Sequence, residues 1–282
     1  MSKNMIYDFS IYKKCKCVGK CMKLKKIFML LVCSSVIMLS AGCTKKNDIS
    51  VDRDTLYQVS TIDSLLSGNY DGFVTIGELK KNGDIGLGTF DMLDGEMMVL
   101  DGEVYRIDSE GKVVKVNDKV TTPFAEVTMF EEDTSKKLTD IDNIDTLQRQ
   151  LNNLITKKNL FYVFRIDAKF DYIKTRSVPK QDKPYPILSE VTKNQSIFEF
   201  HNVEGTIVIV WCPEYIGGVN VSGYHMHFIS DDRTMGGHLL ELRFQQGDVL
   251  VDEVKDFEMH LSNEGTNGSL TNIEDEINKV ER

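Results

Sequence analysis

Short apolar runs separated by turn dipeptides make up the first part of the folded chain. The runs cover residues 73–79, 85–91, 96–100, 103–107 and 113–116, and Asn-Gly, Asp-Gly and Glu-Gly dipeptides divide them. These dipeptides are strong hairpin signals, because Asn, Asp and Gly accept the positive φ that tight hairpin turns need. The pattern predicts a meandering antiparallel sheet in this part of the chain.

Three segments have helical periodicity or helical boundaries instead. Between residues 140 and 157 the apolar side chains recur every three or four positions, at Ile144, Leu147, Leu151, Leu154 and Ile155. Shorter helices are predicted over residues 61–68 and 273–280. Residues 178–186 contain three of the five prolines and are predicted to form an extended loop.

The last third of the chain returns to strand-like patterns. Strands are predicted over residues 161–173, 197–200, 205–212, 217–228, 238–244, 249–254 and 257–261, with a turn at Gly247-Asp248. Together the elements predict a β-rich α+β fold in which two mixed or antiparallel sheet halves are joined by a few helices. We place the halves at residues 55–135 and 136–282, with the candidate metal site on the C-terminal half.

The first 54 residues differ in kind from the rest. A basic stretch from Met22, an apolar run and the small residues before Cys43 resemble a bacterial lipoprotein signal, in which the cysteine carries the lipid. We expect residues 1–42 to be a signal segment, with Met22 as an alternative start, and residues 43–54 to be a lipidated tether. This predicts a protein anchored by lipid on the extracytoplasmic face of the cell membrane. The alternative is an ordinary secretory signal and a secreted protein.

Charge and cysteine content limit the partners. The chain carries a net charge of −9 and residues 1–42 contribute +7, from eight lysines and one aspartate, so the remainder carries −16. Nucleic-acid binding needs a basic face, so this acidity argues against it, and it makes the lipid on Cys43 the expected membrane contact. Only Cys212 follows Cys43, so no disulfide framework is available. A homodimer and a monomer are both compatible with the sequence.

Three of the five histidines, His225, His227 and His238, fall within fourteen residues. The first two are two positions apart, so in a strand they lie on one face, and a Gly-Gly turn precedes the third. Three histidines with an open position are the ligand set of a catalytic zinc ion. The alternative is that each histidine makes hydrogen bonds within a sheet. A cupin-like site would need a glutamate shortly after the pair, where Asp231 and Asp232 stand.

Two charged residues are candidates to act beside such a metal. Arg176 precedes the proline-rich loop, where its guanidinium can hold a carboxylate through two hydrogen bonds. Glu96 stands at the mouth of a turn that leads into an apolar strand, a setting that raises a carboxyl pKa and suits proton donation. The competing interpretations are a surface arginine and a charge at the end of a hairpin.

The segment 170–241 contains four motifs: Arg-Ser-Val-Pro from 176, Lys-Pro-Tyr-Pro from 183, Gly-Tyr-His-Met-His-Phe from 223 and Asp-Arg-Thr-Met-Gly-Gly-His from 232. With these motifs the segment closely resembles the bacterial α-acetolactate decarboxylases, and residues 86–96 also fit that family. The similarity covers about residues 55–282. It implies that the three histidines are the zinc ligands and that Glu96, Arg176 and Thr89 lie beside the metal.

The resemblance also implies a second glutamate from the C-terminal tail, assigned to Glu281, with Glu274 and Glu276 as competing positions. The implied substrate is (S)-2-acetolactate, whose carboxylate is β to a ketone. Zinc held through the ketone and hydroxyl oxygens would act as a Lewis acid. Arg176 would orient the departing carboxylate, and Glu96 would protonate the enediolate to give (R)-acetoin and CO2.

Two functions from other classes compete with decarboxylation. A lipid anchor and a histidine cluster would also suit a non-enzymatic surface lipoprotein that binds a metal or a small ligand. The His/Asp-rich loop usual in a zinc receptor is missing from the sequence. A cupin-like dioxygenase or isomerase is the other alternative, and the ligand spacing disfavours it.

Overall fold

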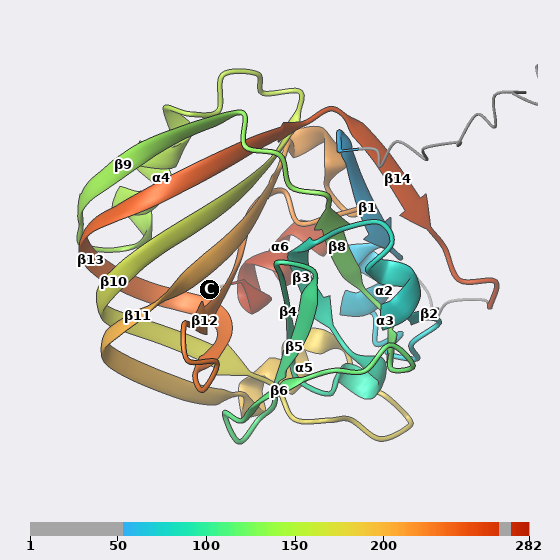
Figure 1. The fold of residues 1–282 in the computed structure, drawn as a ribbon. Helices are drawn as coiled ribbons and strands as arrows, with labels where there is room; N and C mark the ends of the chain where they lie inside the picture. Colours follow the sequence, from blue (N-terminus) through green and yellow to red (C-terminus); the bar gives the residue numbers. More distant parts are fainter. Residues whose placement is uncertain (1–52, 265–271, 282) are drawn as a thin grey trace, which may run out of the picture. The chain divides into compact units, whose positions relative to one another are not determined.

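The computed structural model describes residues 53–264 and 272–281, which contain two large sheets and a few short helices (Figure 1). The first sheet has seven strands, in the order β14 (Asp256–His260), β1 (Thr55–Val59), β8 (Ala125–Thr128), β3 (Ile85–Thr89), β4 (Glu96–Leu100), β5 (Glu103–Ile107) and β6 (Val113–Lys115). The second has five, in the order β10 (Phe161–Ser177), β11 (Ser196–Cys212), β12 (Gly223–Ser230), β13 (Gly236–Val254) and β9 (Thr134–Ile141). The prediction of a β-rich α+β fold is confirmed.

The first sheet is built largely from the predicted hairpins. Strands β3, β4, β5 and β6 pair with one another in sequence order, and all of these pairs are antiparallel. Asp101 and Gly102 connect β4 to β5 with φ values of 53° and 75°, which is the left-handed conformation that this turn dipeptide favours. Strand β14 joins the far edge in parallel to β1, so the sheet is mixed. A short pair, β2 (Val74–Thr75) and β7 (Thr121–Thr122), lies outside both large sheets.

Long strands make up the second sheet, and two predicted interruptions are wrong. Residues 197–200 and 205–212 belong to the single strand β11, and residues 238–244 and 249–254 belong to β13. Gly247 lies within β13 opposite Ala168, where a Cβ would come within 2.8 Å of the alanine Cβ. This glycine therefore permits close strand contact and does not form the predicted turn. Because β10 pairs with both β11 and β13, the pairing β10–β11–β12–β13 closes on itself.

The three predicted helices are confirmed, two of them with shorter bounds, but the apolar run 73–79 that is predicted as a strand is helical over its last four residues. They are α2 (Ile62–Leu66), α3 (Ile76–Leu79), α4 (Ile144–Asn152), α5 (Leu188–Val191) and α6 (Ile273–Val280), with single 3-10 turns at Asp91–Leu93, Thr192–Asn194 and Glu214–Ile216. Thr61 caps α2 by accepting a hydrogen bond from the Ser64 amide. Helix α4 starts later than residue 140 because β9 continues to Ile141 and Asn143 caps the helix. The predicted C-terminal helix, α6, spans the same residues as expected.

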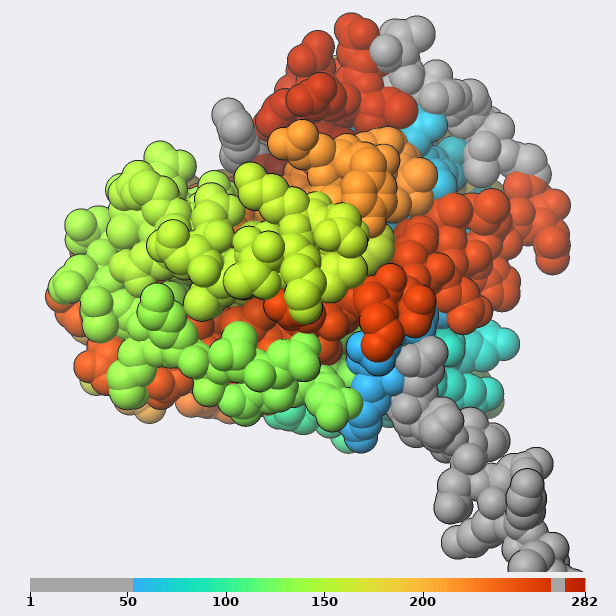
Figure 2. Space-filling view, turned by 90° about the horizontal axis from the view of Figure 1, so that it is seen from above, coloured from blue at the N-terminus to red at the C-terminus, as the bar shows by residue number. Residues whose placement is uncertain are grey.

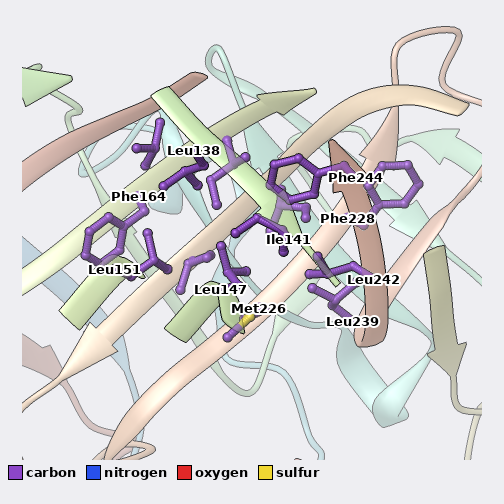
Figure 3. Packing of buried hydrophobic residues seen from close by; sticks show 14 of the residues in the cluster. Leu138, Ile141, Leu147, Leu151, Phe164, Met226, Phe228, Leu239, Leu242 and Phe244 are labelled. Atoms are coloured by element: carbon purple, nitrogen blue, oxygen red, sulfur yellow. The ribbon is translucent and has the colours of Figure 1, made fainter. Parts of the chain in front are cut away.

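Alternate residues of the second sheet face two different cores. One core lies against α4 and includes Leu147, Phe164, Met226, Phe228 and Phe244 (Figure 3). The other lies between the two sheets, where Met98 and Leu100 of β4 join Val208, Val210 and Ile229 of the second sheet. Since Met226 and Phe228 face α4, the odd-numbered residues of β12 face the first sheet. The predicted pair of histidines therefore projects between the sheets.

The helix α6 lies against the other helices near the sheet junction. It packs against α2 and α5, and Ile273 approaches the segment around Gly218, where a glycine Cβ would lie 3.3 Å from its Cδ1. In Figure 2 the dark red C-terminal residues border this orange segment. Val280 and Glu281 at the end of α6 are thereby brought toward β10 and β13.

The described residues, 53–264 and 272–281, belong to one compact unit. The predicted boundary between residues 135 and 136 falls near the start of β9, and β14, from the C-terminal half, pairs with the first sheet. The predicted signal segment, Cys43 and all but the last two residues of the predicted tether lie outside the described residues. Among the described residues, no helix has the length and apolar character needed to span a membrane.

Candidate active site

The structure brings His225, His227 and His238 together between the two sheets. His225 and His227 extend from the same face of β12, and His227 is paired in register with His238 of β13. Their ring centroids lie 5.1–5.4 Å apart, and one nitrogen from each lies within 4.8 Å of the others. All three are buried. Among the described residues, no other group of three or more His, Cys, Asp or Glu side chains is arranged so that it could hold a metal ion.

The predicted Gly-Gly turn before His238 is wrong in detail. Gly236 and Gly237 already belong to β13, and the chain reverses in the polar segment 231–235. Gly237 has φ +132°, and a Cβ on it would lie 2.5 Å from the carbonyl oxygen of Arg176. The glycine therefore allows β13 to approach β10, which places His238 directly opposite Arg176 in the ladder.

The second nitrogens of two histidines are held by the first sheet. His225 Nδ1 lies 3.0 Å from Glu126 Oε1, and His227 Nδ1 lies 2.7 Å from the carbonyl oxygen of Met97. A carbonyl or an ionised carboxylate accepts a hydrogen bond, so Nδ1 carries the proton and Nε2 keeps its lone pair. His238 Nδ1 has no partner among the described residues. This arrangement leaves Nε2 of His225 and His227 free to bind a metal.

Two glutamates and an arginine surround the histidines. Glu96 Oε2 lies 3.5 Å from His227 Nε2, and its Oε1 accepts a 2.9 Å hydrogen bond from Arg176. Glu281 Oε2 lies 3.6 Å from His238 Nε2. A second nitrogen of Arg176 donates to the Val280 carbonyl at 2.8 Å, so the arginine ties the end of α6 to the site.

Thr89 is placed beside Glu96 by the pairing of β3 with β4. The two residues are in register, and the Thr89 hydroxyl donates a 2.8 Å hydrogen bond to the Gly95 carbonyl. The threonine is buried and lines the same cavity as Glu96. Its position fixes the turn that precedes the glutamate.

Of the three competing C-terminal glutamates, only Glu281 reaches the histidines. Glu276 pairs with Lys279 at 2.5 Å, and Glu274 is exposed on the outer side of α6. Helical spacing explains the difference, because Glu281 follows the last helical turn on the side that carries the buried Ile277 and Val280.

Burial and charge shift the pKa values of the site in different directions. Burial raises the pKa of Glu96 and Glu281, although positive charge on Arg176 and His225 opposes this. Burial lowers the pKa of His227 and His238 well below the usual range, and neighbouring positive charges add to the effect. Burial also acts to lower the pKa of His225, but its three neighbouring carboxylates raise it overall. Neutral imidazole is the form that binds a metal, so His227 and His238 are suited to ligation.

A small cavity of about 30 Å³ opens onto these groups. Its polar side is formed by Thr89, Glu96, Arg176, His225, His238 and Glu281, and its apolar side by Ile62, Leu65, Gly88, Leu93, Phe124, Val178 and Leu188. A larger cleft of about 1140 Å³ lies around Lys183 and His260, but it does not contain the histidine cluster. The small cavity therefore brings Glu96, Arg176, Glu281 and two of the histidines to one space.

Sequence reasoning missed Glu126 and Asn220. Both are fully buried, and Asn220 Nδ2 donates to the Glu126 oxygen that does not face His225. The signal available in the sequence was a single acidic residue within the apolar run Ala-Glu-Val of β8. That signal says nothing about its partner, which is 99 residues away along the chain.

Comparison with known proteins decides the family. A family model described as alpha-acetolactate decarboxylase matches residues 56–269. This chain belongs to the alpha-acetolactate decarboxylase family. An alpha-acetolactate decarboxylase of Methanosarcina mazei is 45% identical over 232 residues, which cover 81% of each chain. That of Bacillus subtilis is 40% identical over 82% of this chain and 88% of its own.

A solved structure agrees with the family assignment. The crystal structure of alpha-acetolactate decarboxylase from Bacillus subtilis strain 168 aligns with a TM-score of 0.78 and 38% identity. The alignment covers 80% of this chain and 99% of that one. The predictions of the family and of a decarboxylase are confirmed, and the chain is an enzyme.

Proposed function

We propose that this decarboxylase converts (S)-2-acetolactate into (R)-acetoin and CO2 with a zinc ion held by His225, His227 and His238. The observation that carries the proposal is the convergence of three buried histidines next to a buried glutamate and a buried arginine. The family supports the substrate. The ligand set supports zinc, because three histidines with an open position are typical of catalytic zinc sites.

The residues fit a metal ion at this position. Nε2 of His225 and His227 is left free by the bonds at Nδ1, and the pKa of His227 and His238 is lowered, so these two rings are neutral near pH 7. When bound, the zinc ion supplies Lewis-acid polarisation of the ketone that takes up electrons from the breaking carbon–carbon bond. The remaining steps depend on side chains of the chain itself.

Arg176 is suited to hold the substrate carboxylate. Its Nε is buried and has no hydrogen-bond partner among the described residues, while its two terminal nitrogens bind Glu96 and Val280. A buried donor without a partner is costly, so an incoming carboxylate that accepts this bond is stabilised there. Holding the carboxylate fixes which bond to the central carbon breaks as CO2 leaves.

Glu96 is suited to donate the proton that replaces CO2. Loss of CO2 leaves the bonding electron pair on the substrate as an enediolate, and a proton delivered to its carbon completes the new C–H bond. Burial raises the pKa of Glu96, which favours the protonated carboxyl group needed for this step. Since Glu96 projects from one side of the cavity, the proton reaches one face of the enediolate, which accounts for a single acetoin enantiomer.

Thr89 and Glu281 have supporting roles in this proposal. Thr89 holds the Gly95 carbonyl and therefore positions Glu96. Glu281 supplies a second carboxyl group at the metal site, 3.6 Å from His238 Nε2, whereas Glu96 lies 3.5 Å from His227 Nε2. Both residues act on the geometry of the site around the substrate.

The activity is tested by CO2 release from 2-acetolactate. Purified protein should release CO2 and form acetoin, lose this activity after dialysis against a chelator, and regain it when zinc is returned. Activity that survives complete metal removal would contradict the zinc proposal. Inactivity of the fully zinc-loaded protein toward acetolactate would contradict the substrate.

We also propose that the enzyme is anchored by lipid at Cys43 outside the cytoplasm. The signal-like sequence before Cys43 supports this location. A Cys43→Ser variant should leave the membrane fraction while its activity per molecule is unchanged. Equal membrane recovery of both proteins would contradict the anchor.

A further inference from the structure

Glu126 is a fully buried carboxyl group with two side-chain partners. It lies on β8, between β1 and β3, and its side chain points across the sheet junction toward β12. One carboxylate oxygen faces His225 Nδ1 at 3.0 Å, and the other accepts a hydrogen bond from Asn220 Nδ2. No salt bridge with a lysine or arginine accompanies these contacts among the described residues.

A buried carboxylate is costly unless its oxygens are hydrogen-bonded. An apolar side chain at this position would avoid that cost, as the neighbouring Leu87 does on β3. The two contacts of Glu126 both lead to the start of β12, where the first histidine stands. These contacts favour a role of Glu126 at His225 over a role in the packing of β8.

The contact with His225 has a specific chemical consequence. An ionised carboxylate can only accept, so it holds the ring proton on Nδ1 and directs Nε2 toward the other two histidines. The Met97 carbonyl, 2.7 Å from His227 Nδ1, holds the ring proton of His227 on Nδ1 in the same way. A carboxylate differs from a carbonyl because it also increases the basicity of the ring that it binds.

The second partner, Asn220, is itself held on several sides. Its Oδ1 accepts a 2.6 Å hydrogen bond from the Val221 amide, and its Nδ2 binds Glu126. The neighbouring Val219 carbonyl accepts a 2.7 Å hydrogen bond from Gln58 of β1. The loop that enters β12 is therefore tied to the first sheet at two adjacent residues.

We propose that Glu126, oriented by Asn220, is a positioning residue that fixes the tautomer and direction of His225 for metal binding. This inference rests on the proposed metal site at the three histidines. Glu126 does not line the cavity and does not touch the substrate. It acts through His225 alone.

The test measures zinc affinity by competition with a chromogenic chelator, and separately the thermal unfolding of the zinc-free protein. In Glu126→Gln, either the amide nitrogen faces Asn220 Nδ2, or it faces His225 Nδ1 and shifts the ring proton. Zinc affinity should fall about 10- to 100-fold. Adding Asn220→Asp gives the new amide an acceptor, so the double variant should regain most of the lost affinity.

Thr128→Val is the matched control. Thr128 is equally buried on the same strand, but its hydroxyl donates to the Thr55 carbonyl, away from the histidines. It should change the unfolding of the zinc-free protein without changing zinc affinity. Asn220→Ala leaves the carboxylate in place and is the second variant in case Glu126→Gln does not fold. Its loss of zinc affinity should be intermediate.

The outcomes separate this inference from the metal proposal. Wild-type affinity in Glu126→Gln, or an equal loss in Thr128→Val, would overturn the role of Glu126 while leaving the metal site intact. A double variant no better than Glu126→Gln would overturn the orientation by Asn220. Failure of the wild-type protein itself to bind zinc would instead remove the metal site, and the positioning role with it.

Discussion

Replacing Glu96 with glutamine removes the acidic proton of the carboxyl group and changes little else. Glu96 Oε1 accepts its hydrogen bond from Arg176 at 2.9 Å, and an amide oxygen can accept the same bond. The side chain is 8% exposed, so its contacts are set by packing and not by water. Glutamine has nearly the same shape, and the three histidines are unchanged. The variant should therefore fold and bind zinc as the wild-type protein does.

The expected loss is in the protonation step. A positioned general acid contributes about 10²- to 10⁴-fold to a rate, which corresponds to about 3–5 kcal/mol of activation free energy. Turnover of zinc-loaded Glu96→Gln should fall by this factor, and the acetoin that still forms should lose enantiomeric purity because solvent then supplies the proton. The assay follows CO2 release and resolves acetoin by chiral chromatography, with zinc content measured on the same sample. An unchanged rate with full zinc content would remove Glu96 from the mechanism.

Three further perturbations test other parts of the structure. Arg176→Lys keeps a positive charge beside Glu96 but cannot keep both terminal hydrogen bonds, so kcat/KM should fall about 10- to 100-fold. Amide hydrogen exchange in α6 should also become faster, and unaltered exchange would contradict a role of the hydrogen bond to Val280 in holding the helix. Burial raises the pKa of Asp252 to about 7. The wild-type protein should therefore lose up to about 4 kcal/mol of unfolding free energy relative to Asp252→Asn as the pH rises from about 4 through 7. A difference in urea-unfolding free energy between the two proteins that is the same at every pH would refute this. Leu147→Ala should lower the free energy of unfolding in urea by about 2–5 kcal/mol and leave zinc affinity unchanged, because Leu147 packs on the α4 side of the second sheet. A lower zinc affinity in this variant would show that the two cores are coupled.

Local patterns predicted local structure well. The Asp-Gly turn at 101–102, the short helix within residues 61–68 and the apolar repeat around Leu147 each depend on residues close in sequence, and the structure confirms them. The pair of histidines at 225 and 227 also follows from strand periodicity alone. These features need no knowledge of how distant segments meet.

The failures arose where tertiary contacts decide. Gly247 and Gly237 are turn formers by composition, yet each lies in a strand because a neighbouring strand approaches too closely for a Cβ. Glu126 gave no usable signal, since its meaning depends on a histidine 99 residues away. Glu281 was named only through resemblance, because the placement of α6 determines which C-terminal glutamate reaches the site.

We propose above that three histidines hold the metal on which this decarboxylase depends. The most direct test measures zinc content and acetoin formation together, in the wild-type protein and in His227→Ala. We expect about one zinc ion per wild-type chain with active turnover. We expect neither zinc nor acetoin in the variant, whose folding is checked by circular dichroism. Acetoin formation by folded, zinc-free His227→Ala would contradict the dependence of the activity on a metal held by these histidines.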